Sequence, residues 1–391
     1  MAYDKVQFIG YQIYTGPAKP ASGKPHYVGL DSDAEDIKAR VKIMGQAIEK
    51  AYETSQKAAE DAAKAAREHS GAASGGGSSD ATDPGQILTI FMAPEFYFRG
   101  KNGAYDIQYL TGDVSTEHKP SDTPSLVDML AELISDSKYK DWLFVFGTGV
   151  FKSINPRTNT YEAYNVAIVQ KGGEAHPEDA IKKRVVCMKE HLSSIDFLDA
   201  PDEGITKTSV AHLPAVTDVS YDREINTPGL KGGGANGGAI FNLEGITFGL
   251  EVCLDHYERR LVRAAPQKGQ FYVQIQLIPS GGMNILLPSV ATCKNGLTFN
   301  VDGYNHYKDG LYFLGYHTDL WQTSETLPFN MGQCTPLAPH DKGISLAHGD
   351  LTDFEKLFWI PPAHAGVPCD WKPTLVLYPL LPMPAPTTKT A

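Results

Sequence analysis

Nearly continuous apolar runs recur along the first 280 residues, and each is short enough to form a strand. Residues 87–93 and 142–151 are the clearest examples. Such a run is typical of a strand that is covered on both faces. Segments with helical spacing of apolar residues stand between the runs, as at 33–69 and 125–135. This alternation predicts an α/β fold with helices outside a sheet.

The same patterns predict the order of the remaining elements. We expect one domain over residues 1–391, with insertions near 53–85 and 193–237 and an irregular C-terminal extension from about residue 285. The glycine-rich segment 229–238 lacks the Lys-Ser/Thr pair and the helix of a P-loop, so we expect a mobile loop there. Further strands are expected at 6–14, 164–170, 181–188, 239–243, 246–252, 270–279, 311–316 and 371–380, and helices at 257–265 and from 290.

Charge and cysteine content argue against several classes of protein. A net charge of −11 with only short basic clusters argues against a general nucleic-acid binder. Five cysteines at irregular spacing, without a Cys-x-x-Cys pair, predict neither a disulfide framework nor a structural zinc site. Reduced thiols fit a cytoplasmic protein. The sequence has no apolar run of about twenty residues, so we expect no membrane span, and its first residues do not resemble a signal peptide.

Three ionisable residues each follow an apolar strand closely: Glu95, Lys189 and Cys253. Chemistry in α/β proteins gathers at the carboxyl ends of strands, so we expect them to meet. A carboxylate can accept the proton of a thiol, and an ammonium can stabilise the charge of a tetrahedral intermediate. The thiol would be the nucleophile. Cys253 stands at a predicted strand-to-helix joint, which would expose its side chain and leave backbone N–H groups beside it. Each residue alone has a structural alternative, since a lone cysteine is usually part of a core.

The segments around these residues resemble the nitrilase superfamily of carbon–nitrogen hydrolases. The resemblance rests on a strand followed by Pro-Glu at 92–95 (Met-Ala-Pro-Glu), on Lys-x-His-Leu at 189–192, and on a strand that runs into Cys-x-Asp at 252–255. Smaller matches are Gln12, Tyr164-Asn165 and Pro279-Ser280. The resemblance covers roughly residues 5–285.

This resemblance implies a fold, a reaction and a set of roles. The fold would be a four-layer α-β-β-α sandwich. Glu95 would be the general base, Lys189 the oxyanion stabiliser and Cys253 the nucleophile, which forms a thioester with the substrate. No cofactor and no metal would be used. Members of the family commonly form homodimers or larger homo-oligomers.

The chain departs from the family pattern just after the nucleophile. The Pro-Glu of many family amidases is replaced by the sequence 256–260 (His-Tyr-Glu-Arg-Arg), and the Trp-Glu of the nitrile-cleaving members by Leu254-Asp255. The second glutamate of many amidases has no clear match, and neither Asp196 nor Asp199 can be assigned to it. We therefore expect a small amide or carbamoyl substrate. Nitrile hydrolysis, amide transfer by the same three residues, a Cys-His hydrolase with His256 or His191 as base, and an inactive binding protein are the alternatives.

Three residues near the expected base and nucleophile are predicted to contact the substrate. Tyr97 follows the base, and Leu254 and His256 follow the nucleophile. Aromatic residues here would suit an apolar or flat substrate. Because neighbouring residues of an extended segment face opposite ways, Phe96 and Phe98 would then belong to the core.

Overall fold

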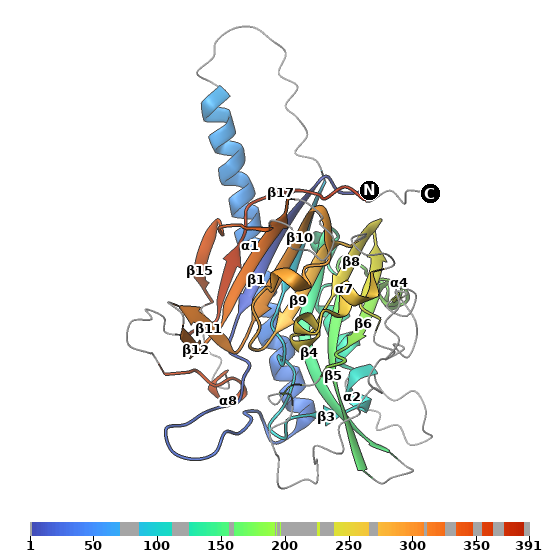
Figure 1. The fold of residues 1–391 in the computed structure, drawn as a ribbon, viewed down its shortest axis with the longest axis vertical. Helices are drawn as coiled ribbons and strands as arrows, with labels where there is room; N and C mark the ends of the chain where they lie inside the picture. Colours follow the sequence, from blue (N-terminus) through green and yellow to red (C-terminus); the bar gives the residue numbers. More distant parts are fainter. Residues whose placement is uncertain are drawn as a thin grey trace.

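Two β-sheets pack face to face and carry helices on their outer sides (Figure 1). The computed structural model describes residues 2–70, 86–111, 125–155, 160–191, 193, 196, 225–226, 238–265, 273–308, 311–324, 334–346, 354–362 and 371–386. The predicted α/β class and the α-β-β-α sandwich are confirmed. In the described part of the chain, no helix combines the length and apolar character needed to cross a membrane.

The first sheet has a parallel centre and antiparallel edges. Strands β1, β2 and β4 run parallel, and β5 and β6 continue antiparallel on one side. The order is β15 (Asp341–Ser345), β16 (Thr374–Leu377), β1 (Lys5–Gln12), β2 (Ile87–Met92), β4 (Trp142–Asn155), β5 (Thr160–Lys171) and β6 (Arg184–Met188), with β17 (Leu381–Pro382) on β1 and β3 (Tyr105–Asp106) on β4.

The second sheet is also mixed, with β8, β9 and β10 parallel at its centre. Its order is β14 (Cys334–Pro336), β13 (His317–Thr323), β10 (Thr292–Asp302), β9 (Val273–Ser280), β8 (Ile246–Leu250) and β7 (Ile240–Leu243). Strands β11 (Asn305–Lys308) and β12 (Leu311–Leu314) form a separate hairpin.

The apolar runs read from the sequence lie on strands that are buried on both faces. In β2, Ile90 packs into the core between the sheets, whereas Phe91 packs into a second core on the outer side of the first sheet. The two sheets meet through contacts such as Phe8 with Phe299, whose ring centroids are 5.0 Å apart. This double burial explains why β2 lacks the alternation of a half-exposed strand.

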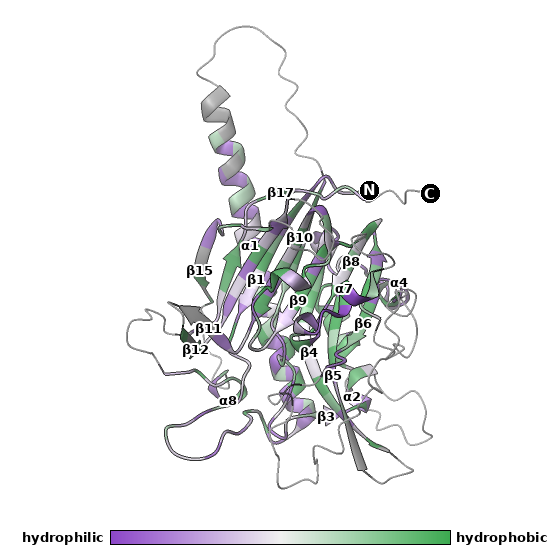
Figure 2. Cartoon of the chain, viewed as in Figure 1, coloured by the Kyte–Doolittle hydropathy of each residue, from purple (hydrophilic) through white to green (hydrophobic). Residues whose placement is uncertain are grey.

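Helices cover the outer faces unequally. The long helix α1 (Asp33–Ser70) buries Ile37, Met44 and Ile48 against the first sheet, together with α3 (Leu126–Leu133). The end of α1 extends beyond the sheets (Figure 1). The coloured turns of this projecting part mix hydrophilic and weakly hydrophobic residues (Figure 2). In the part of the chain that the structure describes, the outer side of the second sheet carries only short helices, α7 among them (Figure 1). The short helices are α2 (Gln108–Thr111), α4 (Pro177–Lys182), α6 (Leu254–Tyr257), α7 (Arg260–Ala264), α8 (Phe354–Leu357), η1 (Ser137–Tyr139) and η3 (Leu287–Ser289).

The region after residue 285 differs from the prediction of an irregular extension. Strand β10 lies at the centre of the second sheet, and β16 pairs with β1 in the first. The helix expected from residue 290 is therefore the start of β10. The helix expected at 257–265 is replaced by two short ones, α6 ending at Tyr257 and α7 beginning at Arg260, because Arg259 between them takes a left-handed conformation with φ of 58°. Of the expected insertions, residues 53–70 continue α1, while 71–85, most of 193–237 and nearly all of the glycine-rich segment lie outside the described residues.

Candidate active site

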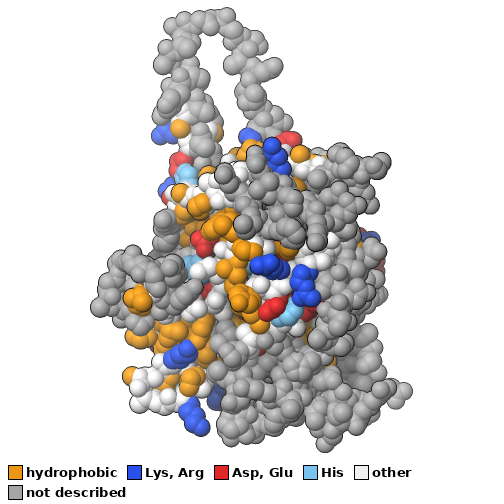
Figure 3. Space-filling view, viewed as in Figure 1, with side chains coloured by type: hydrophobic (Ala, Val, Ile, Leu, Met, Phe, Trp, Pro, Cys, Tyr) orange, Lys and Arg blue, Asp and Glu red, His pale blue; other side chains and the backbone are white. Residues whose placement is uncertain are grey.

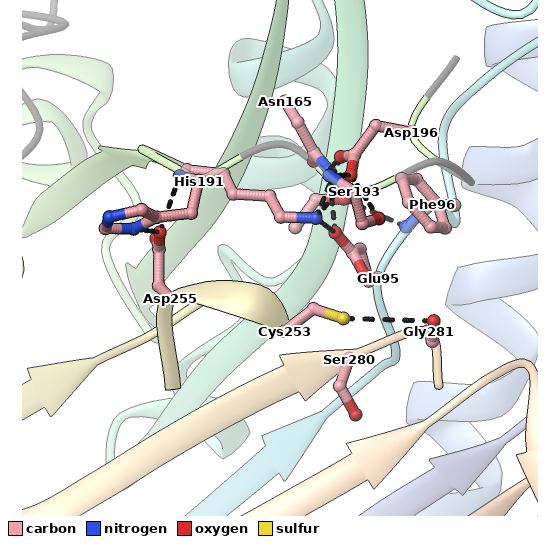
Figure 4. A network of polar contacts seen from close by, with 12 residues as sticks. Glu95, Phe96, Asn165, His191, Ser193, Asp196, Cys253, Asp255, Ser280 and Gly281 are labelled. Carbon is pink, nitrogen blue, oxygen red and sulfur yellow. Dashed lines mark hydrogen bonds and ion pairs between the residues drawn. The ribbon is translucent and has the colours of Figure 1, made fainter. Parts of the chain in front are cut away.

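Three strands end at one seam between the sheets, and each is followed by one of the ionisable residues identified in the sequence. Glu95 follows β2 and Lys189 follows β6, both in the first sheet, whereas Cys253 follows β8 of the second sheet. All three residues are buried. Figure 4 shows the Glu95 carboxylate between Asn165 and the Cys253 sulfur. The structure thus brings the three predicted residues together.

Cys253 occupies the turn between β8 and α6, with φ of 49° and ψ of −104°. Positive φ is unfavourable for a residue with a Cβ atom and persists only where the surrounding structure enforces it. The Cys253 N–H donates to the Pro279 carbonyl at 3.2 Å, and Sγ lies 3.8 Å from the Gly281 carbonyl oxygen. The residue is only 3% exposed, so the thiol is covered and not open as predicted.

The backbone N–H groups at this turn are used unequally. Because Cys253 donates to Pro279, its N–H is not free for a substrate. The Leu254 N–H has no acceptor among the residues that the structure describes. One of the donors expected at the joint is therefore available, and it belongs to the residue after the nucleophile.

The backbone around Glu95 is held from both sheets. The Glu95 carbonyl accepts a hydrogen bond from Thr15 Oγ1 at 2.5 Å, and its N–H donates to the Ser280 carbonyl at 3.3 Å. Phe96 turns the chain with φ of 64°, and its N–H donates to Thr148 Oγ1 at 2.9 Å. Since Thr15 follows β1, Thr148 lies in β4 and Ser280 ends β9, the position of Glu95 depends on both sheets.

The two carboxylate oxygens of Glu95 have different surroundings. Oε1 accepts hydrogen bonds from Lys189 Nζ at 2.9 Å and from Asn165 Nδ2 at 2.7 Å. Oε2 has no nitrogen or oxygen partner in the described part of the chain. It lies close to Gly281, where an added Cβ would be 3.1 Å away. The Cys253 thiol is close enough to the Glu95 carboxyl group to lower its pKa, although burial has the larger and opposite effect. Oε1 is thus held by one cation and one amide donor, while Oε2 lies next to Gly281, whose carbonyl oxygen is 3.8 Å from the Cys253 sulfur.

Lys189 is enclosed by two carboxylates. Its Nζ lies 2.9 Å from Glu95 Oε1, and 2.9 and 2.6 Å from the two oxygens of Asp196. Burial opposes the charge of Lys189, but attraction to Asp196 and Glu95 outweighs it and raises the pKa of the ammonium. Asp196 is buried as well, and the charge of Lys189 holds the pKa of its carboxyl below the usual value. Lys189 therefore stays charged at neutral pH.

Glu95 and Cys253 have pKa values displaced in the same direction. Burial raises the pKa of Glu95 from 4.5 to about 7, with Lys189 opposing the shift and Asp196 adding to it. Burial, together with repulsion from Glu95, raises the pKa of the Cys253 thiol well above its usual value, although Lys189 acts against this. The resting site holds a neutral thiol beside a carboxyl group that ionises near pH 7.

Asp255, the acid of the Cys-x-Asp motif, connects the segment after β6 to the helices after β8. Its Oδ1 accepts the His191 N–H at 2.8 Å and lies 2.9 Å from His191 Nδ1. Its Oδ2 accepts a hydrogen bond from an Arg260 guanidinium N–H at 3.1 Å. Burial would raise the pKa of Asp255, but Arg260 and His191 lower it. Lys189 lies just before His191 in the sequence, and Cys253 lies just before Asp255. The buried contact between His191 and Asp255 therefore fixes the position of Lys189 relative to Cys253.

No protein-family model and no curated protein sequence matches this chain. Solved structures do resemble it. One is Nit3 of Saccharomyces cerevisiae, a member of branch 10 of the nitrilase superfamily, with 12% identity over 86% of this chain and 91% of that chain, and a TM-score of 0.38. A CN-hydrolase superfamily protein from Xanthomonas campestris has 9% identity over 85% and 91%, with a TM-score of 0.33. A glutamine-dependent NAD(+) synthetase from Cytophaga hutchinsonii has 12% identity over 85% and 42%, with a TM-score of 0.36.

Two of these proteins are described as members of the nitrilase or CN-hydrolase superfamily, which is also the family that the three sequence motifs resemble. In this chain, Glu95, Lys189 and Cys253 of those motifs meet at the seam. Leu192, the last residue of the second motif, lies outside the described residues, as does Asp199.

The structure does not place Tyr97 in the site. Its hydroxyl donates to the Arg40 carbonyl at 3.2 Å, and its ring packs against Tyr11 and Phe358 in the core beneath α1. Because the chain turns at Phe96, Tyr97 points into the core and Phe96 points toward the site, which is the opposite of what the sequence predicted. The Phe96 ring therefore borders the site, where it would lie 2.9 Å from a Cβ added at Gly281.

The two histidines considered as bases are committed to other partners. His256 is fully buried, with Nδ1 2.7 Å from Glu251 Oε2, and its Nε2 accepts the Leu286 N–H at 3.0 Å. His191 is bound to Asp255, a contact that raises its pKa. The expectation that His256 lines the substrate pocket is not met, because both ring nitrogens are used internally. Leu254 is partly exposed beside the nucleophile and stays a predicted substrate contact.

Asp196 and Asn165 join the site beyond the three predicted residues. Asn165 Nδ2 donates to both carboxylates, at 2.7 Å to Glu95 and 2.8 Å to Asp196. Asn165 could have been found from the Tyr164-Asn165 match to the family. Asp196 had only the signal of an acid soon after Lys189, in a segment without periodicity. Its position is set by Ser193, whose N–H and hydroxyl both donate to Oδ2 at 2.6 Å.

Proposed function

We propose that this protein is a carbon–nitrogen hydrolase of the amidase type, which cleaves a small amide or carbamoyl substrate through a thioester on Cys253. One observation carries the proposal: the Glu95 carboxylate holds the Lys189 ammonium on Oε1, leaves Oε2 without a partner among the described residues, and lies beside the Cys253 thiol (Figure 4). A base, a cation and a nucleophile are the three groups that acyl transfer requires.

The first step is attack of sulfur on the substrate carbonyl carbon. Because the thiol is neutral at rest, its proton must leave as the S–C bond forms, and Glu95 is the acceptor. Its pKa of about 7 suits this role, since the carboxylate is then present at neutral pH and is still basic enough to hold the proton.

The carbonyl oxygen becomes negatively charged in this step and needs donors. Lys189 supplies a fixed positive charge, and the Leu254 N–H is an available backbone donor beside the sulfur. Asp196 binds the Lys189 ammonium through both of its oxygens and so orients it. Such prearranged donors in a dry site can be worth several kcal/mol each, on the order of 3.

Collapse of the intermediate breaks the C–N bond. The proton on Glu95 passes to the leaving nitrogen, so ammonia or an amine departs and a thioester remains. Water then attacks the thioester, with Glu95 again accepting a proton, and the carboxylic acid and free thiol are released. In sum, amide and water yield acid and ammonia, and no redox partner is needed.

The test is mass spectrometry of the intact protein mixed with a pooled set of amides, carbamoyl compounds and nitriles, together with ammonia release. We expect an acyl adduct on Cys253 and no ammonia from Cys253→Ala. Ammonia release by Cys253→Ala would refute the proposal. Ammonia release in which the acyl group appears on an added amine, and not as the free acid, would indicate amide transfer. No adduct with any compound would support an inactive binding protein.

We also propose that the protein forms a homodimer, through the face that carries α7. Figure 3 shows hydrophobic side chains near the centre of this face, and Tyr257 and Leu287 are 60% and 40% exposed. Size-exclusion chromatography with light scattering should give about twice the chain mass. A monomer at micromolar concentration would contradict this.

A further inference from the structure

We propose that His256, held by Glu251, is a positioning residue that fixes the loop covering the nucleophile. The loop comprises residues 281–286, between β9 and η3. This inference deepens the proposed function and rests on it for its catalytic consequence. The contacts themselves stand independently of it.

A buried acid–histidine pair flanks the nucleophile in the sequence. Glu251 precedes Cys253 by two residues and His256 follows it by three, and neither side chain is exposed. Their atoms meet across the turn, with Glu251 Oε2 2.7 Å from His256 Nδ1. The turn at Cys253 is thereby closed by a polar contact as well as by its backbone. A buried carboxylate and imidazole persist only when fully hydrogen-bonded, as these are.

The remaining contacts of Glu251 orient it. Its Oε1 accepts the Leu261 N–H at 2.8 Å, and its Oε2 also accepts Gln276 Nε2 at 2.7 Å. Gln276 in turn donates to the Ser289 carbonyl at 3.1 Å and accepts the Ala291 N–H at 2.8 Å. The carboxylate thus has one available arrangement, which presents Oε2 to His256.

The partners of His256 define which ring nitrogen carries hydrogen. Nε2 accepts the Leu286 N–H at 3.0 Å, so it must present its lone pair. The hydrogen is then on Nδ1, which donates to Glu251. An imidazole is suited to this place because it donates on one side and accepts on the other, in one rigid ring.

The loop held in this way borders the reacting groups. At its start, the Gly281 carbonyl lies 3.8 Å from Cys253 Sγ, and Asp302 accepts the Met283 N–H at 2.7 Å. At its end, Leu286 is tied to His256. Both ends of the loop are therefore anchored, one to β10 and one to the nucleophile's own helix. Without the second anchor, the Leu286 end of the loop would be free to move while its start stays bound to Asp302.

Two conservative variants separate the functions of the ring. In His256→Gln, the side-chain oxygen reaches the position of Nε2 and can still accept the Leu286 N–H. In His256→Asn, the side chain can still donate to Glu251 but is too short to reach Leu286. His340→Asn, at an exposed histidine of the first sheet near β15, is the matched control.

The decisive measurements are amide hydrogen exchange at Leu286 and the rate at which iodoacetamide alkylates Cys253. In His256→Asn, we expect the Leu286 amide to exchange at least about tenfold faster than in the wild type. Iodoacetamide should also alkylate Cys253 several-fold faster in this variant, because the loop no longer covers the thiol. His256→Gln and His340→Asn should match the wild type in both. Amide turnover should fall about tenfold in His256→Asn and recover in His256→Gln.

Three outcomes would overturn the inference. One is equal loss of Leu286 protection in the Asn and Gln variants. Another is unchanged protection in His256→Asn. The third needs no variant: a wild-type Leu286 amide that exchanges as fast as unbonded loop amides, while Ala291 is protected. If no amide is turned over by any protein, the proposed function fails while exchange and alkylation still decide the role of His256.

Discussion

Titration of Glu95 should control the reactivity of Cys253, and the structure gives the size of the effect. The perturbation is a change of pH between 5 and 9, with Glu95→Gln as the paired variant. Burial raises the pKa of Glu95 to about 7, and only its ionised form can accept the thiol proton. Reactivity should therefore rise with pH, with its midpoint near 7 rather than at the 4.5 of an exposed glutamate.

The magnitude follows from the fraction of carboxylate. With a pKa of about 7, about 1% of Glu95 is ionised at pH 5, about half at pH 7 and nearly all at pH 9. The alkylation rate should then rise about 50-fold from pH 5 to 7 and only about twofold from 7 to 9. A thiol that ionised without a base, with its pKa above the usual value, would instead react about 100-fold faster at pH 9 than at pH 7.

The assay is iodoacetamide labelling of Cys253, followed by peptide mass spectrometry, with Cys334 as an internal reference thiol in the same protein. Glu95→Gln should lose the inflection near pH 7 and continue to rise through pH 9. The reasoning is refuted if the wild-type profile shows no inflection between pH 6 and 8, or if Glu95→Gln retains it.

Three further substitutions test other parts of the site. Asp196→Asn removes a negative charge that raises the pKa of Glu95, so the inflection of the labelling profile should move below pH 7; an unchanged inflection would show that Asp196 does not act on the base. Gly281→Ala places a methyl group 2.9 Å from the Phe96 ring and 3.1 Å from Glu95 Oε2, and should change the labelling rate at pH 7 about tenfold while circular dichroism stays the same. Asp255→Asn weakens a buried pairing with Arg260 and should lower the free energy of unfolding in urea by about 3 kcal/mol; a change below about 1 kcal/mol would mean that the link contributes little.

The positions of Glu95, Lys189 and Cys253 could be predicted because each depends on a local pattern. An apolar run marks the strand, and the strand's end marks the edge of the sheet. That these three residues meet then follows from one general rule, that functional side chains in α/β proteins gather at the carboxyl ends of strands. The helix at 33–69 and the buried strands at 87–93 and 142–151 were predictable for the same reason, as α1, β2 and β4 show.

Residues whose place depends on a turn or on a distant partner could not be predicted. Tyr97 was expected in the pocket, but the positive φ of Phe96 sends its ring into the core. His256 was expected to face the substrate, but its two ring nitrogens are bound to Glu251 and Leu286, which both lie outside α6. Strand β10 was missed because Gly296 and several polar residues interrupt its pattern. Asn300 is one of these polar residues, and its buried side-chain oxygen accepts a hydrogen bond from the Ser280 hydroxyl.

The division of the site between two sheets bears on how the protein acquires activity as it folds. Glu95 and Lys189 are joined within the first sheet, but Cys253 reaches them only when the second sheet has docked. An intermediate with one formed sheet would contain the Glu95–Lys189 pair without Cys253 beside it, or the reverse. During refolding, the Glu95-dependent alkylation of Cys253 would consequently appear with sheet docking and not with the formation of secondary structure. The rate at which a pulse of iodoacetamide alkylates Cys253 would therefore report when the two sheets dock, without the need for an engineered label.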